Sequence, residues 1–227
     1  MRKINSLNTT IIRKVLMALT GLFLCFFLII HLAGNLQLLL PHEIAQTQYN
    51  AYSHILSGNF IIKLVSYVLY VSILAHALLA LVLTIVNWRA GGSKYAVDKR
   101  RQVSGWITRN MGILGSLIFV FLIVHLADFW YVYKFGHPPM DAAGNKDLYT
   151  IVVEVYKEPL YVVGYVIAMI VLGFHLWHGF QSAFRTLGLY NFKYHKWVKY
   201  FGFFFSIVMT VGFAIIPIIL YFRFAGG

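Results

Sequence analysis

Five long apolar runs, separated by short polar segments, dominate the pattern of the chain. Each run is at least as long as the roughly 20 residues that an α-helix needs to cross a bilayer. We predict five transmembrane helices, near residues 13–39, 61–87, 109–134, 159–185 and 198–223. Segments typical of turns lie between them, at 56–59, 89–93 and 137–139. Pro217 lies within the fifth run, where it removes one backbone hydrogen bond and is expected to bend the helix.

The composition agrees with this pattern. Hydrophobic residues make up 60% of the 227 residues and charged residues only 11%, whereas about a quarter of a soluble domain is charged. The first run is too long for the apolar part of a cleavable signal peptide. We therefore predict an all-α integral membrane protein with a single domain over residues 1–227, in which four helices form a bundle and a fifth packs beside it.

Basic residues are distributed unequally between the two ends of the predicted helices. Fourteen of the 19 Lys and Arg residues fall at one end and five at the other. Because cytoplasmic loops carry the excess of positive charge, the N-terminus is expected in the cytoplasm and the C-terminus outside. The net charge of +12 lies in segments between spans, where topology accounts for it, so it does not indicate a nucleic-acid partner. The cytoplasmic segments 89–108 and 186–199 are expected to dock soluble subunits, although lipid headgroups alone would also account for their charge.

Several classes of chemistry are excluded by what the chain lacks. Cys25 is the only cysteine, so the chain holds no disulfide framework, iron–sulfur cluster, thiolate zinc site or covalent haem attachment of its own. It has no GxGxxG and no P-loop motif, so it encodes no flavin or nucleotide fold. It is therefore not a complete dehydrogenase by itself.

Four histidines stand alone within four separate apolar runs: His31, His76, His125 and His175. An ionisable side chain at membrane depth is costly without a partner, so each one indicates a functional site. One such histidine is equally well accounted for by an interhelical hydrogen bond. One on each of four helices favours axial ligation of haem iron, because a bundle brings imidazoles to opposite faces of a porphyrin.

Depth along the helices sorts these histidines into pairs. With a rise of about 1.5 Å per residue, His31 and His125 lie about 24–26 Å from the basic end of their helices. His76 and His175 lie about 15–20 Å from it. We therefore predict an outer haem between His31 and His125 and an inner haem between His76 and His175. His178, three residues beyond His175 and on nearly the same face, is an alternative ligand.

Short motifs around these histidines are similar to those of a known family. They are TGLFL at 20–24, AHALLA at 75–80, VHL at 124–126 and H-x-x-x-G at 175–179, and they occur in order on the first four predicted helices. With them the chain resembles the single-chain, five-helix, di-haem cytochrome b anchor of succinate:quinone oxidoreductases, the succinate dehydrogenase and fumarate reductase complexes. Each motif alone is weak, and the resemblance lies in the ordered set.

The resemblance implies a function that the residues alone do not. The first and third helices would hold an outer haem b and the second and fourth an inner one. An iron–sulfur subunit carrying a flavoprotein subunit would dock at the cytoplasmic face of a bacterial cytoplasmic membrane. Electrons would pass between that subunit, the haems and a quinone, often menaquinone in such members. Trp106, Arg109 and Arg185 would be candidates to bind haem propionates, with topology and interfacial anchoring as the equal alternative.

Two positions depart from the family pattern. Some members carry a glutamate on the fourth helix, two residues before the histidine, that is linked to proton movement; the matching residue here is Gly173. The acid that those members use near an outer quinone site has no clear match. Asp128, Glu43 and His54 are the candidates for proton transfer to quinone at the outer end, with ordinary polar residues as the alternative.

Two other functions remain alternatives at this point. One is the haem b subunit of another quinone-linked membrane oxidoreductase, of the hydrogenase or formate dehydrogenase type. The other is a transporter that uses histidines as a proton or metal relay. Transporter sites usually gather at the midplane, whereas these histidines are separated by helix and by depth.

Overall fold

A computed structural model describes residues 2–90 and 105–225, with side chains at 10–89 and 105–225. All regular elements in these residues are helices, and one isolated bridge joins Met140 to Lys146. Five helical segments are long and apolar enough to cross a membrane: Thr10–Leu39, Phe60–Arg89, Met111–Phe135, Pro159–Thr186 and His195–Phe224. The predicted spans are confirmed, and the chain is a multi-pass membrane protein.

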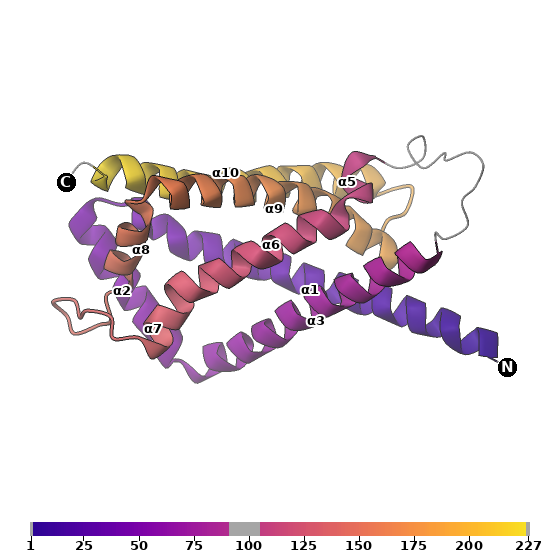
Figure 1. The fold of residues 1–227 in the computed structure, drawn as a ribbon, viewed down its shortest axis with the longest axis horizontal. Coiled ribbons are helices and arrows are strands. Elements are labelled where there is room, and N and C mark those ends of the chain that lie inside the picture. The colour runs from indigo at the N-terminus through magenta and orange to yellow at the C-terminus, as the bar shows by residue number, and fades with distance from the viewer. Residues whose placement is uncertain (1, 91–104, 226–227) are drawn as a thin grey trace.

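The long helices run along the length of the molecule, with the N-terminus at one end and the C-terminus at the other (Figure 1). They are α1 (Arg2–Asn35), α3 (Phe60–Ala90), α6 (Met111–His125), α9 (Pro159–Thr186) and α10 (His195–Phe224). The third span continues beyond α6 through a π-helix, η2 (Leu126–Tyr131), and α7 (Val132–Phe135). A one-turn helix, α5 (Trp106–Arg109), precedes α6.

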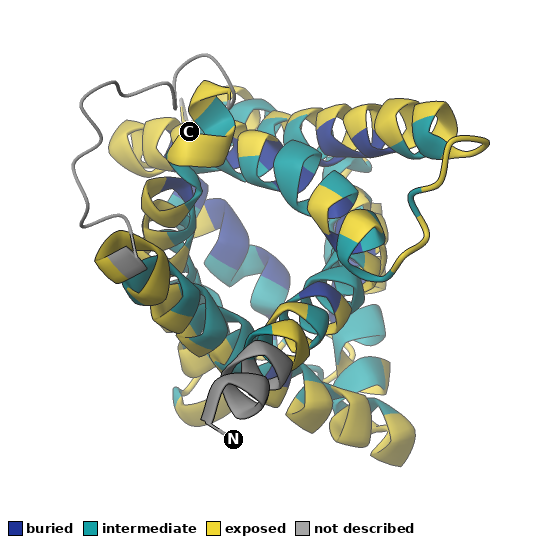
Figure 2. Ribbon diagram, turned by 90° about the vertical axis from the view of Figure 1, so that its right-hand side faces the viewer, coloured by how far each residue is buried: buried dark blue, intermediate teal, exposed yellow. Residues whose placement is uncertain are grey.

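Four of these helices form a ring, seen end-on in Figure 2. α1 packs against α3 and α9, and α6 packs against α3 and α9. Therefore α1 faces α6 across the bundle, and α3 faces α9. The fifth long helix, α10, packs outside the ring against α9 and, less extensively, α1.

Shorter elements cover the end of the bundle where the chain terminates. They are η1 (Leu36–Leu39), α2 (His42–Gly58) and α8 (Leu148–Tyr156). Arg223 at the end of α10 donates hydrogen bonds to the carbonyl oxygens of Leu39 and Leu40, at 3.1 and 2.8 Å. These bonds satisfy carbonyls at a helix terminus, which have no partner within the helix.

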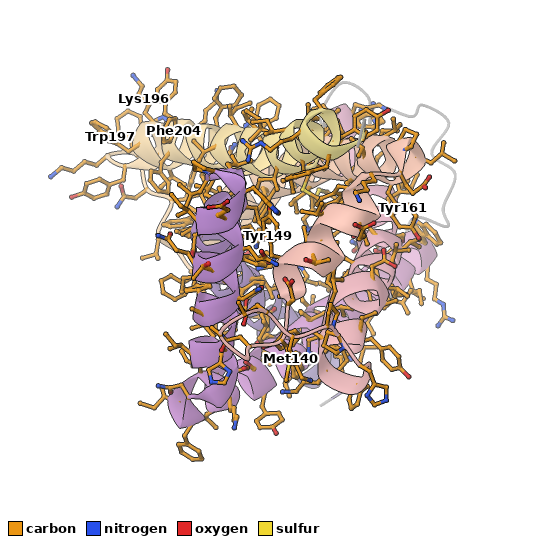
Figure 3. The ribbon with its side chains drawn as sticks, turned by 90° about the vertical axis from the view of Figure 1, so that its left-hand side faces the viewer. Met140, Tyr149, Tyr161, Lys196, Trp197 and Phe204 are labelled. Carbon is orange, nitrogen blue, oxygen red and sulfur yellow. The ribbon has the colours of Figure 1, made fainter. Side chains whose placement is uncertain are left out.

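The contact between α2 and α8 is built around buried Asp147, the N-cap of α8. Its carboxylate accepts hydrogen bonds from the Thr150 amide at 3.0 Å, Asn50 at 2.9 Å, the Thr150 hydroxyl at 2.8 Å and Gln46 at 2.6 Å. Tyr149, labelled in Figure 3 between α2 and α8, is 1% exposed, and His42 bonds its hydroxyl at 3.0 Å. Burial alone would raise the pKa of Asp147, but these hydrogen bonds outweigh it and hold the pKa below its usual value.

Candidate functional site

The outer histidines meet across one diagonal of the ring. His31 on α1 and His125 at the end of α6 have ring centroids 5.8 Å apart, with planes at 88°. Phe27 stacks on His31 and Phe121 on His125, while Phe213 of α10 packs against His31. The pair is thus enclosed by aromatic side chains.

The inner histidines meet across the other diagonal. His76 on α3 and His175 on α9 have ring centroids 6.3 Å apart, with planes at 70°. Glycines of the two intervening helices face these rings: a Cβ at Gly21 would lie 3.2 Å from Cε1 of His76, and one at Gly115 would lie 3.7 Å from Cε1 of His175. A larger residue at Gly21 would crowd the His76 ring.

The two pairs lie at different depths in the bundle, and α1 and α6 show this independently. On α1, Gly21 contacts the inner pair and His31 belongs to the outer pair, ten residues further on. On α6, Gly115 and His125 are likewise ten residues apart. Ten residues of α-helix span about 15 Å, so two histidine pairs are stacked along the bundle axis at this spacing. The rings that meet are those that depth along the sequence predicts.

The spacing within each pair fits one metal ion between two imidazoles. With metal–nitrogen bonds of about 2 Å on opposite sides of the ion, the ring centres are about 6 Å apart. Two protein ligands per centre match haem, in which the porphyrin supplies the remaining nitrogens.

A hydrogen bond between helices holds one imidazole. The Thr20 hydroxyl lies 2.8 Å from the Leu16 carbonyl oxygen and 3.2 Å from Nδ1 of His76. When the hydroxyl donates to the carbonyl, its oxygen accepts from Nδ1 of His76. This tautomer leaves Nε2 of His76 with a free lone pair, as a metal ligand requires. At His31 the side-chain amide nitrogen of Asn35 lies 3.4 Å from Nδ1, and it donates to the His31 carbonyl oxygen at 2.8 Å.

Buried polar atoms without a hydrogen-bond partner occur at both histidine pairs. Within the described residues there are four: Nδ1 of His125, Nδ1 of His175, Oδ2 of Asp128 and the hydroxyl of Tyr165. An unsatisfied buried group costs about 1–3 kcal/mol, so these atoms are costly positions in the bundle. Both histidine pairs contain one, and the remaining two lie beside the outer pair.

Asp128 lies in the π-helix η2, one turn beyond His125. π-Helical turns often occur at functional sites, because the extra residue redirects side chains. Asp128 is within electrostatic range of Tyr165 and Tyr156, and the Tyr165 ring packs 6.2 Å from the ring of His125. Because the third span continues to Phe135, Asp128 lies within it and not at its outer end.

A lipid-facing groove of about 310 Å³ between α6 and α9 leads to Tyr165. Its lining is almost entirely apolar, from Phe121 and Val124 on α6 and Leu160, Tyr161 and Gly164 on α9. Glu43 and His54, the other two candidates for proton transfer, occupy exposed positions of α2. Of the three candidates, Asp128 is therefore the one that lies beside the outer histidine pair.

The remaining candidates gather at the opposite, basic end. His178 contacts the Thr108 hydroxyl through Nδ1 at 3.3 Å, and it lines a second pocket with Trp106 and Arg185. His175, and not His178, forms the pair with His76. The Arg185 guanidinium stacks over the Tyr190 ring at 4.8 Å, while Arg109 ends α5 as an exposed residue.

Gly173 has a packing role. It is buried on α9, and a Cβ at this position would collide with the Thr210 hydroxyl of α10. This collision is the physical reason why a larger side chain is disfavoured here. Sequence reasoning missed Tyr165 and the role of Thr20, because both act through contacts between helices.

The chain was compared with models of protein families, with curated proteins and with solved structures, and no match was found.

Proposed function

We propose that this protein is the di-haem cytochrome b anchor of a succinate dehydrogenase or fumarate reductase complex. It would pass electrons between an iron–sulfur subunit and a membrane quinone. One observation carries the proposal: two pairs of imidazoles face each other across the two diagonals of one bundle. Within the pairs the ring centroids are 5.8 and 6.3 Å apart.

Haem b, when bound, supplies reversible one-electron chemistry at its iron. The protein's own residues then have distinct tasks. His31 and His125 would hold the outer group, and His76 and His175 the inner one. Thr20 orients His76, and the aromatic side chains around His31 and His125 exclude water from the outer pair. Two centres stacked along the bundle axis favour electron transfer across the membrane.

The outer end suits quinone chemistry. Quinone reduction takes two electrons and two protons, so a proton-transferring group must stand near an electron carrier. Asp128 and Tyr165 are polar groups beside His125, and the apolar groove at Tyr165 is suited to an isoprenoid tail such as that of menaquinone. The basic end, with Lys193, Lys196 and Lys199, would face the cytoplasm of a bacterium and dock the iron–sulfur and flavoprotein subunits.

The test is to purify the complex from membranes and to measure haem content, absorption spectrum and copurifying subunits. We expect two haems b per chain, together with a flavoprotein and an iron–sulfur subunit, and haem reduction by succinate. His76→Ala is expected to remove about half of the haem and to leave the outer one. His178→Ala, the matched control, is expected to keep both.

Different outcomes identify the alternatives. Reduction of the haems by hydrogen or formate, with the corresponding subunits bound, would assign another quinone-linked oxidoreductase. Full haem retention in both His76→Ala and His175→Ala would overturn the ligand assignment. A protein without haem that moves protons or metal ions would instead be a transporter.

A further inference from the structure

The pocket at the basic end of the molecule has no role in the electron path described above. It measures about 280 Å³ and is lined by residues of α5, α9 and α10 and by Gly105. Its polar lining consists of Thr108, His178, Gln181, Arg185 and Lys199. Its aromatic walls are Trp106 and Trp177.

The pocket opens away from the histidine pairs. On α9, Trp177 and Gln181 are two and six residues beyond His175, which places them about 200° and 240° around the helix from it. Because His175 faces the interior of the ring, these residues face outward. His178, about 60° from His175, stands at the boundary between the two regions.

The depth of the pocket is that of lipid headgroups. Arg185 is near the end of the fourth span, Lys199 near the start of the fifth, and Trp106 and Thr108 directly precede the third. Tryptophan at such positions is typical of the membrane–water interface. An occupant at this depth therefore meets both a polar layer and the edge of the hydrocarbon.

The described lining of the pocket carries two cations, Arg185 and Lys199. Neither Arg185 nor Lys199 forms an ion pair within the described residues. No Asp or Glu occurs in residues 105–127 or 159–227 of the sequence, so no acid on these helices competes for the two cations. Arg185 is also held in place by stacking on Tyr190. Two cations from different helices beside hydrogen-bond donors match a phosphate group.

We propose that this pocket binds the phosphate of an anionic phospholipid, with Arg185 and Lys199 on the phosphate and Trp106 and Trp177 against the glycerol and upper acyl chain. Basic pockets between membrane helices bind such headgroups in this way. The site does not depend on haem or on the proposed electron transfer. It gives Arg185 and Trp106 a partner other than a haem propionate.

The experiment measures phospholipid bound to the purified full-length protein by native mass spectrometry, at fixed concentrations of phosphatidylglycerol or phosphatidylcholine. Wild-type protein is expected to retain phosphatidylglycerol in preference to phosphatidylcholine. Arg185→Gln and Lys199→Gln are each expected to weaken phosphatidylglycerol binding about fivefold, since a basic residue near an anionic surface contributes roughly 1 kcal/mol. Lys193→Gln removes a charge at the same end, outside the pocket lining, and is expected to bind as wild type does.

Further measurements distinguish a phospholipid site from a free-phosphate site and from a haem-propionate site. Arg185→Lys keeps the charge and is expected to retain the lipid, which excludes misfolding as the cause of loss in Arg185→Gln. Inorganic phosphate at millimolar concentration is expected not to displace the lipid; full displacement would make this a free-phosphate site and overturn the proposal. Loss of haem with unchanged lipid binding in the double variant would assign both cations to haem propionates and would also overturn it.

Discussion

The four membrane histidines differ in what holds Nδ1. His76 has the Thr20 hydroxyl, His31 has the Asn35 amide, and His125 and His175 have no partner within the described residues. The histidines themselves could be predicted, because ionisable groups are rare in apolar runs. Thr20 could not, because it meets His76 across 56 residues of sequence and a threonine in a membrane span is not unusual.

The first prediction concerns Thr20. Thr20→Val keeps the shape of the side chain and removes the oxygen that accepts from His76. Loss of an outer-shell partner typically lowers metal affinity by 10–100-fold, so the inner haem should be lost preferentially on dilution or dialysis. Haem content and the midpoint potential of each haem measure this. Thr20→Ser keeps the hydroxyl and should behave as wild type; equal haem loss in both variants would contradict the role of the hydroxyl.

The second prediction concerns Asp128. Asp128→Asn removes an acid beside the outer pair without changing its size. We expect quinone turnover to fall by at least 10²-fold, the usual effect of removing a general acid or base, with both haems still bound. Succinate oxidation with a soluble artificial acceptor should be unchanged. Asp141→Asn, in the connection between α7 and α8, is the control. Unchanged quinone turnover in Asp128→Asn would place proton transfer elsewhere.

At the scale of the helices, α9 and α10 pack closely against each other. Gly173 leaves room for Thr210 and for no further atom. Gly173→Ala is therefore expected to lower the free energy of unfolding by about 1–3 kcal/mol through overpacking, and Gly173→Glu by more. Thermal unfolding in detergent measures both. Gly164→Ala on the same helix meets no atom within 4 Å and should not destabilise, and Thr210→Ala should partly rescue Gly173→Ala.

The cap formed by α2 and α8 depends on the Asp147 carboxylate. Because its pKa in the folded protein is below the value of about 3.9 in the unfolded chain, its contribution is complete above about pH 5. The contribution is lost as the pH falls through the folded-state pKa. We expect hydrogen exchange in Leu148–Tyr156, corrected for intrinsic rates, to accelerate on acidification below pH 4 in wild type. Asp147→Asn should be less protected at pH 6 and less sensitive to acid, and equal acid sensitivity would exclude Asp147.

These elements mark where sequence pattern succeeds and where it does not. The five spans could be predicted because an apolar run of about 20 residues is rare outside membrane helices. The segment 42–59 has only a weak helical pattern and looks like a polar connection. It nevertheless forms α2, because packing on α8 and η1 stabilises it. The π-turn at Asp128 and the buried position of Asp147 depend on contacts that no local pattern encodes.

At the scale of the molecule, an odd number of spans places the two ends of the chain at opposite ends of the bundle (Figure 1). The basic excess lies at the end near Arg185 and Lys199, and the outer histidine pair and the cap lie toward the other end. Under the proposed function, the end that faces the cytoplasm would be the one where soluble subunits dock. The distribution of charge predicts that the basic end faces the cytoplasm.

Single cysteines at the two ends test this orientation. Cys25 lies within the first span and is replaced by Ala, and then Lys193→Cys and Lys134→Cys are introduced separately at exposed positions. In intact cells a membrane-impermeant maleimide is expected to label Lys134→Cys and not Lys193→Cys, whereas broken cells should show labelling of both. In the assembled complex, a photocrosslinker on the Lys193→Cys thiol should reach an iron–sulfur subunit. Labelling of Lys193→Cys in intact cells, with crosslinks only from Lys134→Cys, would invert the molecule in the membrane and move the docking face to the cap.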